Sequence, residues 1–434
     1  MNVNVSVPTA RQIAILGLAL LVSVTGWAAK ETALYSFLQD GSTGYEPDGG
    51  LVADMSGNLY GTTSLGGINP VDCSNGFGCG TVFELSPPLQ LGGVWTETVL
   101  YEFQGGADGD RPICTPVIDK DGNLYGTSSF AQGNGIVVWE LSPPSQQGGP
   151  WTQTTLYNFP GLLYDGGLLM DSAGNLYGTS YYGGSANCGL GCGTVFEVSP
   201  PKLGGGWTGT VLYSFQGGAD SEYPFGTLIL DNKGALYGTT AGIEGYPCPC
   251  GTVFRLVPPA EPEGAWTKYV LYSFSGADGS SPEGGLLFDR RGNLYGTTTY
   301  GGPQNCAGRQ GCGNVFELSP PSQPHGVWIE NVLHTFTDQN TGDGHFPQCT
   351  LIMDEHGNLY GTTGAGGRQG RGTVFELLPP GSGGGLWTEV RFPLGNNGNF
   401  DLYLPAAGLI FGPGKAVSGT ATAYTGGGVF SISP

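Results

Sequence analysis

The stretch Gly292-Asn293-Leu294-Tyr295-Gly296-Thr297-Thr298 decides the fold, because close copies of it return along nearly the whole chain. The other copies begin at Gly57, Gly122, Gly174, Gly234 and Gly357, and a degenerate seventh copy is Ala416-Val417-Ser418-Gly419-Thr420. Successive copies are 52 to 65 residues apart. Seven copies at this spacing predict one repeat array, not two or three unrelated domains.

Each repeat contains four segments with the composition of β-strands. The fifth repeat shows them most clearly, at Gly285–Asp289, Asn293–Thr298, Gly313–Leu318 and Trp328–Phe336. The first two segments are joined by a predicted tight hairpin, because an Asp side chain can accept hydrogen bonds from backbone amides and Gly can adopt positive φ. We expect a structural role for this Asp, which recurs at Asp54, Asp119, Asp171, Asp231 and Asp354.

The strand order predicts a closed ring. Both faces of the second segment carry apolar or aromatic residues, which is typical of sheets stacked face to face. An all-β, seven-bladed β-propeller of four-stranded blades is the simplest arrangement. Residues 33–37 resemble a fourth strand, whereas the last repeat supplies only three. We expect the N-terminal strand to complete the last blade; a β-helix or an open row of sheets would not explain its position.

The first residues predict export. Arg11 precedes an apolar run, Ile13–Val24, and Gly26-Trp27-Ala28 offers small residues where a signal peptidase cleaves. We interpret residues 1–28 as a signal peptide and residues 29–434 as a single propeller domain. An uncleaved anchor is the alternative, but the run is short for a bilayer span. The mature protein is expected to have no membrane span and to be secreted, periplasmic or extracellular.

The composition limits the class of partner. The chain has 15 Lys and Arg against 35 Asp and Glu. Phosphate backbones and anionic membrane surfaces repel such a chain, so we expect no nucleic acid partner. Charged residues make up only 12% of the sequence and Gly occurs 81 times, which indicates turns and closely approaching strands instead of helices.

Ten cysteines in an exported chain predict disulfides. We expect three local pairs in the loops before the third strand, Cys73 with Cys79, Cys188 with Cys192, and Cys306 with Cys312. Cys248 and Cys250 occupy the same place, although so short a ring would be strained. A zinc site is the alternative for these spacings, but the paired two-cysteine knuckles of structural zinc sites are missing. Cys114 and Cys349 have no assignable partners.

The repeat has a recognisable pattern, Gly-Leu-Leu-x-Asp-x-x-Gly-Asn-Leu-Tyr-Gly-Thr-Thr followed by Gly-Thr-Val-Phe-Glu-Leu. It resembles the GloVer tandem repeat of bacterial "choice-of-anchor" exported proteins, and its first hairpin is similar to that of NHL-type β-propellers. The resemblance covers about residues 32–434. It implies an exported, often surface-associated propeller without a defined biochemical activity.

One face of the propeller is the candidate functional face. It carries the connections from the fourth strand to the next first strand and from the second strand to the third. These loops are acidic and variable, and variable loops on a rigid scaffold commonly bind ligands. The candidate ligand-binding residues on them are Asp108, Asp110, Asp220, Glu222, Asp278, Asp343 and His345.

A second set of candidates follows a recurring proline before the first strand. This slot holds Asp48, Ile113, Asp165, Phe225, Glu283, Gln348 and Ala406. We expect the carboxylates of Asp48, Asp165 and Glu283 to ring the mouth of the central channel. Such oxygen ligands suit calcium, the one cofactor that the sequence suggests. Solvated turn residues are the alternative, since no loop has the ligand spacing of a known calcium loop.

The sequence contains no nucleophile elbow, phosphate loop or two-histidine metal motif. We therefore expect a non-enzymatic binding or surface-interaction protein whose partners are carbohydrates or proteins at the cell exterior. Loop aromatics such as Tyr181, Tyr182 and Tyr223 are suited to stacking on sugar rings or on a protein partner. The alternative is a calcium-dependent hydrolase or lyase acting on sugars at the channel mouth. Neither ligand identity nor oligomeric state follows from the sequence.

Overall fold

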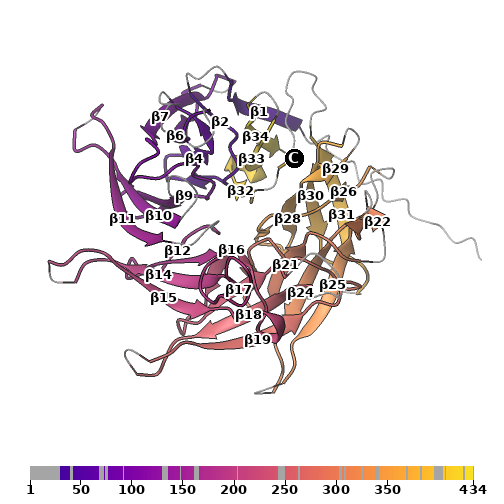
Figure 1. The fold of residues 1–434 in the computed structure, drawn as a ribbon. Coiled ribbons are helices and arrows are strands. Elements are labelled where there is room, and N and C mark those ends of the chain that lie inside the picture. Colours follow the sequence, from indigo (N-terminus) through magenta and orange to yellow (C-terminus); the bar gives the residue numbers. More distant parts are fainter. Residues whose placement is uncertain are drawn as a thin grey trace, which may run out of the picture.

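The computed structural model shows seven four-stranded antiparallel sheets arranged in a ring (Figure 1). It describes residues 30–433 except 40–42, 68–72, 74–76, 91, 130–134, 147, 161–165, 203, 243–249, 262–263, 303–304, 307–308, 324–325, 338–341, 368–369, 382–383, 395–403, 406 and 424–425. The predicted signal peptide lies outside the described residues. Among the residues that are described, no helix has the length and hydrophobicity that a membrane span requires.

Within each sheet, or blade, strands A to D follow one another outward from the channel. Strands A are β3 (Val52–Ala53), β8 (Val117–Ile118), β12 (Leu169–Met170), β16 (Pro224–Leu230), β20 (Leu287–Phe288), β27 (Ile352–Met353) and β32 (Ile410–Phe411). Strands B are β4 (Leu59–Thr63), β9 (Leu124–Ser129), β13 (Leu176–Ser180), β17 (Leu236–Thr240), β21 (Leu294–Thr298), β28 (Leu359–Thr363) and β33 (Val417–Ala421).

Strands C are β6 (Thr81–Ser86), β10 (Gly135–Ser142), β14 (Thr194–Ser199), β18 (Thr252–Val257), β24 (Asn314–Ser319), β30 (Thr373–Leu378) and β34 (Gly428–Ser433). Strands D are β7 (Thr96–Glu102), β11 (Thr152–Pro160), β15 (Thr208–Ser214), β19 (Thr267–Ser273), β25 (Ile329–Thr335), β31 (Thr388–Pro393) and β1 (Lys30–Ser36). Blades 1 to 7 follow this order. The predicted strands are therefore present, with A strands mostly shorter than expected.

The ring closes as predicted. The N-terminal β1 pairs antiparallel with β34, from Lys30 opposite Ser433 to Ser36 opposite Gly428. Figure 1 shows indigo β1 beside yellow β34. The amide of Phe37 also donates to the carbonyl of Gly427 at 2.9 Å. The two ends of the chain thus form one sheet, and blade 7 has an outer strand like the others.

The glycine of the repeated stretch allows strand C to approach strand B. A Cβ atom on Gly178 would lie only 2.4 Å from Cζ of Phe196 in the same blade. The preceding Tyr177 is buried in a cluster that includes Leu236 and Phe254 of the next blade. Glycine is therefore required for close packing within a blade, and tyrosine fills the space between blades.

The A–B hairpin is held by its aspartate. Asp289 Oδ1 accepts hydrogen bonds from the amides of Arg291 and Asn293, both at 2.8 Å. Its Oδ2 accepts from Asn293 Nδ2 at 2.9 Å and from the Tyr295 hydroxyl at 3.5 Å. Gly292 has φ of 86°. These contacts confirm the predicted structural role of the repeated aspartate.

The threonine that follows the glycine of the repeated stretch joins neighbouring blades in six repeats, whereas Thr127 Oγ1 of blade 2 has no hydrogen-bond partner among the described residues. Thr62 Oγ1 donates to the carbonyl of Cys114 in blade 2 at 2.9 Å. Thr420 Oγ1 in blade 7 donates to the carbonyl of Gly49 in blade 1 at 2.8 Å, which repeats the contact at the closure. Corresponding bonds are made by Thr179, Thr239, Thr297 and Thr362. The repeated stretch therefore stabilises the ring as well as each sheet.

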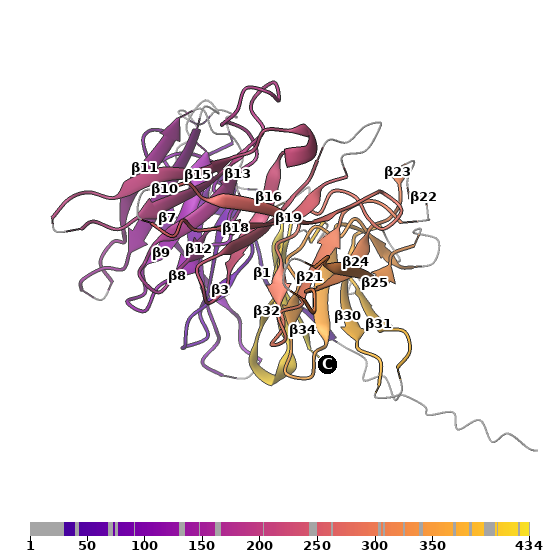
Figure 2. The same ribbon diagram turned by 90° about the horizontal axis from the view of Figure 1, so that it is seen from below.

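The D–A and B–C connections lie together on one face, as expected. Short ribbons join them: β2 (Gly44–Tyr45) pairs with β5 (Leu65–Gly66), and β26 (Gly344–His345) pairs with β29 (Ala365–Gly366). A further hairpin, β22 (Asn305–Cys306) with β23 (Arg309–Gln310), lies within one B–C connection. The described residues include the 3-10 turns η1 (Gly218–Asp220) and η3 (Pro413–Lys415). Figure 2 shows connections projecting from both sides of the ring.

Three predicted disulfides close the B–C connections. They are Cys73–Cys79, Cys188–Cys192 and Cys306–Cys312. Cys250 is also disulfide-bonded, whereas Cys248, its predicted partner, lies outside the described residues. Cys114 and Cys349 are buried thiols that are not disulfide-bonded. Each thiol accepts a hydrogen bond from a strand B amide, that of Thr127 at 3.2 Å and that of Thr362 at 3.0 Å.

Candidate functional site

The slots before the A strands meet at the mouth of the central channel. A cavity of about 330 Å³ there is lined by residues of all seven blades, including Asp48, Phe225, Glu283 and Gln348. A smaller hollow of about 180 Å³ shares Asp48 and Gln348. Two of the three predicted channel carboxylates thus face one cavity. Asp165, the third, lies outside the described residues.

In blades 2, 4 and 6 an unusual backbone turn presents the slot residue. The residue before the proline has positive φ, 48° at Arg111, 60° at Tyr223 and 60° at Phe346. Residues other than glycine rarely adopt positive φ, and each residue held there costs roughly 1–3 kcal/mol of stability. The amides of Arg111 and Tyr223 donate to the carbonyls of Cys79 and Cys192, each at 2.8 Å. Disulfide-closed B–C loops thus hold the turns that point the slots toward the channel.

The polar part of the cavity wall contains carboxylates in different surroundings. Glu283 Oε2 accepts hydrogen bonds from Thr299 Oγ1 at 2.8 Å and from Gln348 Nε2 at 2.6 Å. Asp48 is exposed in the cavity, but nearby protein partly desolvates its carboxylate. This desolvation raises the pKa of Asp48, and a hydrogen bond with Ser64 opposes the effect. The wall can therefore accept hydrogen bonds from a polar ligand.

Phe225 is the aromatic residue of the cavity wall, and it belongs to a group of rings in blades 3 and 4. Tyr181 and Tyr223 stack with centroids 4.6 Å apart and an interplanar angle of 8°. Tyr181 also meets the edge of Phe225 at 5.9 Å, and Tyr182 contacts both tyrosines. Phe225 is 36% exposed and lines the cavity. One partly exposed aromatic ring, in contact with another ring behind the wall, therefore adjoins the hydrogen-bonding groups.

The predicted loop carboxylates Asp108, Asp220 and Asp278 lie beside the outer D strands and do not line the cavity. Each accepts a hydrogen bond from the strand D tyrosine of its own blade: Tyr101 to Asp108 at 2.8 Å, Tyr213 to Asp220 at 2.7 Å, and Tyr272 to Asp278 at 2.5 Å. Backbone amides of Gln104, Gln216 and Ser275 also donate to them, each at 2.8 Å. These aspartates hold the D–A loops in place.

A D-strand residue of the next blade contacts the D strand or D–A loop of the preceding blade at the rim of the ring, and we call this group of residues an inter-blade node. Lys268 of blade 4, with 3% of its side chain exposed, forms an ion pair with Asp220 Oδ1 at 2.9 Å. Glu97 of blade 1 accepts a hydrogen bond from Tyr35 of blade 7 at 3.4 Å. Glu330 and Glu389 occupy the same strand D position in blades 5 and 6, opposite the leucine of strand C. The nodes therefore link successive blades at the rim.

The remaining candidates are buried in the loops. Asp110 is 1% exposed and its backbone bridges to Ser129. Glu222 is 4% exposed, and its carboxylate lies beside the Cys188–Cys192 disulfide. His345 is also 4% exposed and contacts the ring of Phe346 at 4.5 Å. They lie in the D–A connections, as expected, but their side chains are buried.

The node between blades 4 and 5 predicts a pH dependence of stability. Burial, reinforced by the charge of Asp278, raises the pKa of Glu330 to about 7. An unfolded glutamate has a pKa of about 4.3, so the native state retains the proton more strongly. Stability must then fall as pH rises from about 4.5 to 7 and level off above.

We expect Glu330→Gln to raise the free energy of unfolding by on the order of 1 kcal/mol at pH 8, after allowance for solvent screening, and to have little effect at pH 5. Urea denaturation at both pH values measures this. The exposed Glu261→Gln is the control and should change neither value. An equal effect of Glu330→Gln at pH 5 and pH 8 would contradict the assignment.

Sequence reasoning missed the interacting group His334, Asp343, Glu389 and Arg391 as a unit. His334 in strand D contacts Glu389, which lies in the D strand of the following blade. Only Asp343 was a candidate. The available signal was that His334 occupies the slot that other D strands fill with tyrosine or phenylalanine.

The sequence pattern of the Gloeobacter/Verrucomicrobia repeat matches residues 20–190, 71–309 and 249–434. A comparison with curated proteins finds no significant match. Among solved structures, the chain is similar to a glucose dehydrogenase, with 15% identity and a TM-score of 0.45 over 73% of this chain and 94% of that one.

Two other similar structures are a Xanthomonas campestris gluconolactonase (14% identity, TM-score 0.37, 73% of this chain and 84% of that one) and a Trichoderma reesei carbohydrate-active enzyme of family AA12 (12% identity, TM-score 0.44, 93% and 95%). These scores are too low to carry over an activity. The repeat pattern, in contrast, spans nearly the whole chain and all seven blades. The chain therefore belongs to the Gloeobacter/Verrucomicrobia repeat family.

Proposed function

We propose that this protein is an exported, non-enzymatic binding propeller that takes a carbohydrate ligand at the mouth of its central channel. The observation that carries the proposal is the cavity of about 330 Å³, in which exposed Phe225 lies on the same wall as Asp48, Glu283 and Gln348. Ligand sites commonly combine an apolar surface with a few convergent polar groups. A sugar ring presents both an apolar face and hydroxyl groups.

The surroundings of Phe225 support this proposal. Tyr181, which stacks on Tyr223, packs against the Phe225 ring and restricts it, so little side-chain entropy is lost when a ligand covers it. Carboxylate and amide oxygens of Glu283 and Gln348 are suited to accept hydrogen bonds from sugar hydroxyls. The three closed disulfides support an oxidising compartment, and with it export.

A calcium-dependent hydrolase or lyase remains the alternative. The same cavity contains Asp48 and Glu283. Among the residues that the structure describes, however, neither belongs to a group of three potential metal ligands. Glu283 is instead hydrogen-bonded to Thr299 and Gln348. This geometry favours ligand binding over metal-dependent catalysis at the channel mouth.

The test is a glycan array probed with the mature protein, followed by calorimetry with the glycan that binds. We expect Phe225→Ala to weaken binding at least tenfold, which corresponds to about 1.4 kcal/mol. Phe77→Ala removes an aromatic ring that is 58% exposed and does not line the cavity, and should leave affinity unchanged. A flat array, or equal losses in both variants, would contradict the proposal. Calcium-dependent release of sugar fragments would favour the alternative.

A further inference from the structure

The inter-blade nodes share a pattern, and the node between blades 5 and 6 departs from it. In strand D, the residue opposite the valine that directly precedes the buried aromatic residue of strand C is Tyr35, Tyr101, Tyr157, Tyr213, Tyr272 or Phe392 in six blades. In blade 5 it is His334, opposite Val315. An imidazole nitrogen thus occupies a position that elsewhere holds a phenol or an apolar ring.

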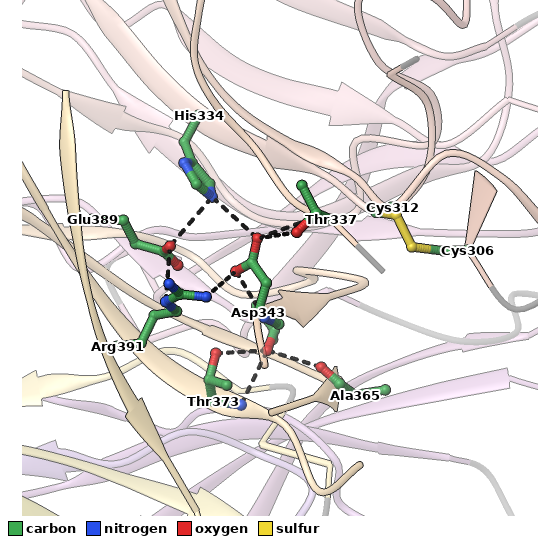
Figure 3. A network of polar contacts seen from close by, with 11 residues as sticks. Cys306, Cys312, His334, Thr337, Asp343, Ala365, Thr373, Glu389 and Arg391 are labelled. Atoms are coloured by element: carbon green, nitrogen blue, oxygen red, sulfur yellow. Dashed lines mark hydrogen bonds and ion pairs between the residues drawn. A yellow bond between two sulfur atoms is a disulfide. The ribbon is translucent and has the colours of Figure 1, made fainter. Parts of the chain in front are cut away.

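This imidazole lies between two carboxylates from different segments. His334 Nε2 is 3.8 Å from Asp343 Oδ2 and 3.7 Å from Glu389 Oε2 (Figure 3). Both distances are too long for hydrogen bonds. The three potential ligand atoms all lie within 4.8 Å of one another. All three atoms are therefore close enough together to contact a single ion.

The group contains buried polar atoms with unmet bonding capacity. His334 Nε2 and Glu389 Oε1 are buried and have no hydrogen-bond partner. The Glu389 side chain is only 9% exposed and that of Asp343 only 4%. Buried polar atoms without partners are rare in folded proteins. A cation among these three side chains would satisfy them and offset two buried negative charges.

Neighbouring groups fix the orientation of the candidate ligands. Asp343 Oδ2 accepts hydrogen bonds from the amide and the hydroxyl of Thr337 at 3.0 and 2.9 Å, and Oδ1 accepts from the amide of Gly344 at 2.9 Å. The imidazole of His334 packs edge-on against Phe336 with centroids 4.7 Å apart. Such outer contacts are what hold metal ligands in position in proteins.

We propose that His334, Asp343 and Glu389 bind a divalent transition-metal ion of the zinc type, which links blades 5 and 6 at the rim of the ring. Ligands of tetrahedral zinc, at about 2.0–2.1 Å from the ion, lie about 3.3 Å apart. The separations of His334 Nε2 from the two carboxylate oxygens, 3.8 and 3.7 Å, exceed this spacing by about 0.4–0.5 Å, and the two carboxylate oxygens lie within 4.8 Å of each other. An imidazole with two carboxylates suits zinc better than calcium, which takes oxygen ligands.

Arg391 competes with the ion. Its Nε lies 3.3 Å from Glu389 Oε2 and its Nη1 lies 3.9 Å from Asp343 Oδ1. The side chain is 40% exposed, so it can turn into solvent when the ion enters. The other described group of three potential ligands, Cys188, Cys192 and Glu222, contains a disulfide and offers no thiolate. The node between blades 5 and 6 is therefore the stronger metal candidate.

The matched variant is His334→Tyr, because tyrosine fills this slot in five other blades and should preserve the fold. The test is zinc calorimetry and metal analysis on the mature, disulfide-intact, tag-free protein after removal of bound metal. We expect one zinc ion per chain, affinity reduced at least tenfold by His334→Tyr and by Glu389→Gln, and affinity unchanged or increased by Arg391→Ala. Excess zinc should raise Tm by about 3 °C in the wild type but not in His334→Tyr.

The control is His356→Gln, which removes an exposed histidine 3.7 Å from Glu355 and reports adventitious zinc binding. It should leave both affinity and the Tm shift unchanged. Equal zinc binding by wild type and His334→Tyr, or no saturable binding by the wild type, would overturn the proposal. The site is at the rim and is independent of the carbohydrate proposal, so glycan binding by the same variants distinguishes the failure of one from the failure of the other.

Discussion

Deletion of Lys30–Phe37 is expected to abolish cooperative folding of the whole ring. These residues supply strand D of blade 7, and β1 pairs with β34 along its length. Phe37 is 2% exposed and packs edge-on against Phe83 of blade 1 at 4.9 Å. Without them, blade 7 has an open edge and blade 1 loses part of its core.

The expected loss exceeds what a typical protein can tolerate. Removing a buried phenylalanine side chain costs about 3–5 kcal/mol. Each lost backbone hydrogen bond between β1 and β34 adds about 0.5–1.5 kcal/mol, whereas most proteins are stable by only about 5–15 kcal/mol. The measurement compares residues 29–434 with the deleted chain by thermal denaturation and size-exclusion chromatography. We expect the deleted chain to aggregate or to unfold without a sharp transition.

A synthetic peptide of Lys30–Leu38 provides the control, since an added strand can pair with an exposed sheet edge. The peptide should restore a cooperative transition in the deleted chain. A peptide with Phe37→Ala should restore it less well. An unchanged Tm after deletion would show that the closing strand does not stabilise the ring.

The ring can be predicted from the sequence because it depends on the number and order of the repeated segments. Seven copies of one stretch set the blade number, and the presence of a fourth strand only at the other terminus indicates closure. Local chemistry also suffices for the A–B hairpin, where Asp289 and Gly292 act within a few residues of each other. The three local disulfides follow for the same reason, since each pair lies in one loop.

The side-chain directions of the loop carboxylates could not be predicted, because they depend on contacts between blades. Asp220 belongs to a loop that could equally face the channel. Its position at the rim is determined by Tyr213 of its own blade and Lys268 of the next. His334 and Glu389 meet for the same reason, although they are far apart in sequence. Comparison of one slot across all repeats is the signal that reveals such substitutions.

Gly178→Ala is expected to destabilise the protein by about 2–3 kcal/mol, although it adds a single methyl group. The new Cβ would lie 2.4 Å from Cζ of Phe196 and 3.0 Å from Cε1 and Cε2. Both residues are on central strands of blade 3, and Phe196 is fully buried. The ring cannot retreat without displacing the core that packs behind it. Urea denaturation measures the change in the free energy of unfolding.

A second substitution tests whether this clash is the cause. Phe196→Leu shortens the side chain that the methyl group meets, so Gly178→Ala should cost less in that background, and the two changes should be non-additive. Gly206→Ala in the same repeat is the matched control. No atom lies within 4 Å of its added Cβ, and its φ is not positive, so stability should change by no more than about 0.5 kcal/mol. Additive effects of Gly178→Ala and Phe196→Leu would instead place the cost in strand propensity, and the glycine would then not be needed for close packing.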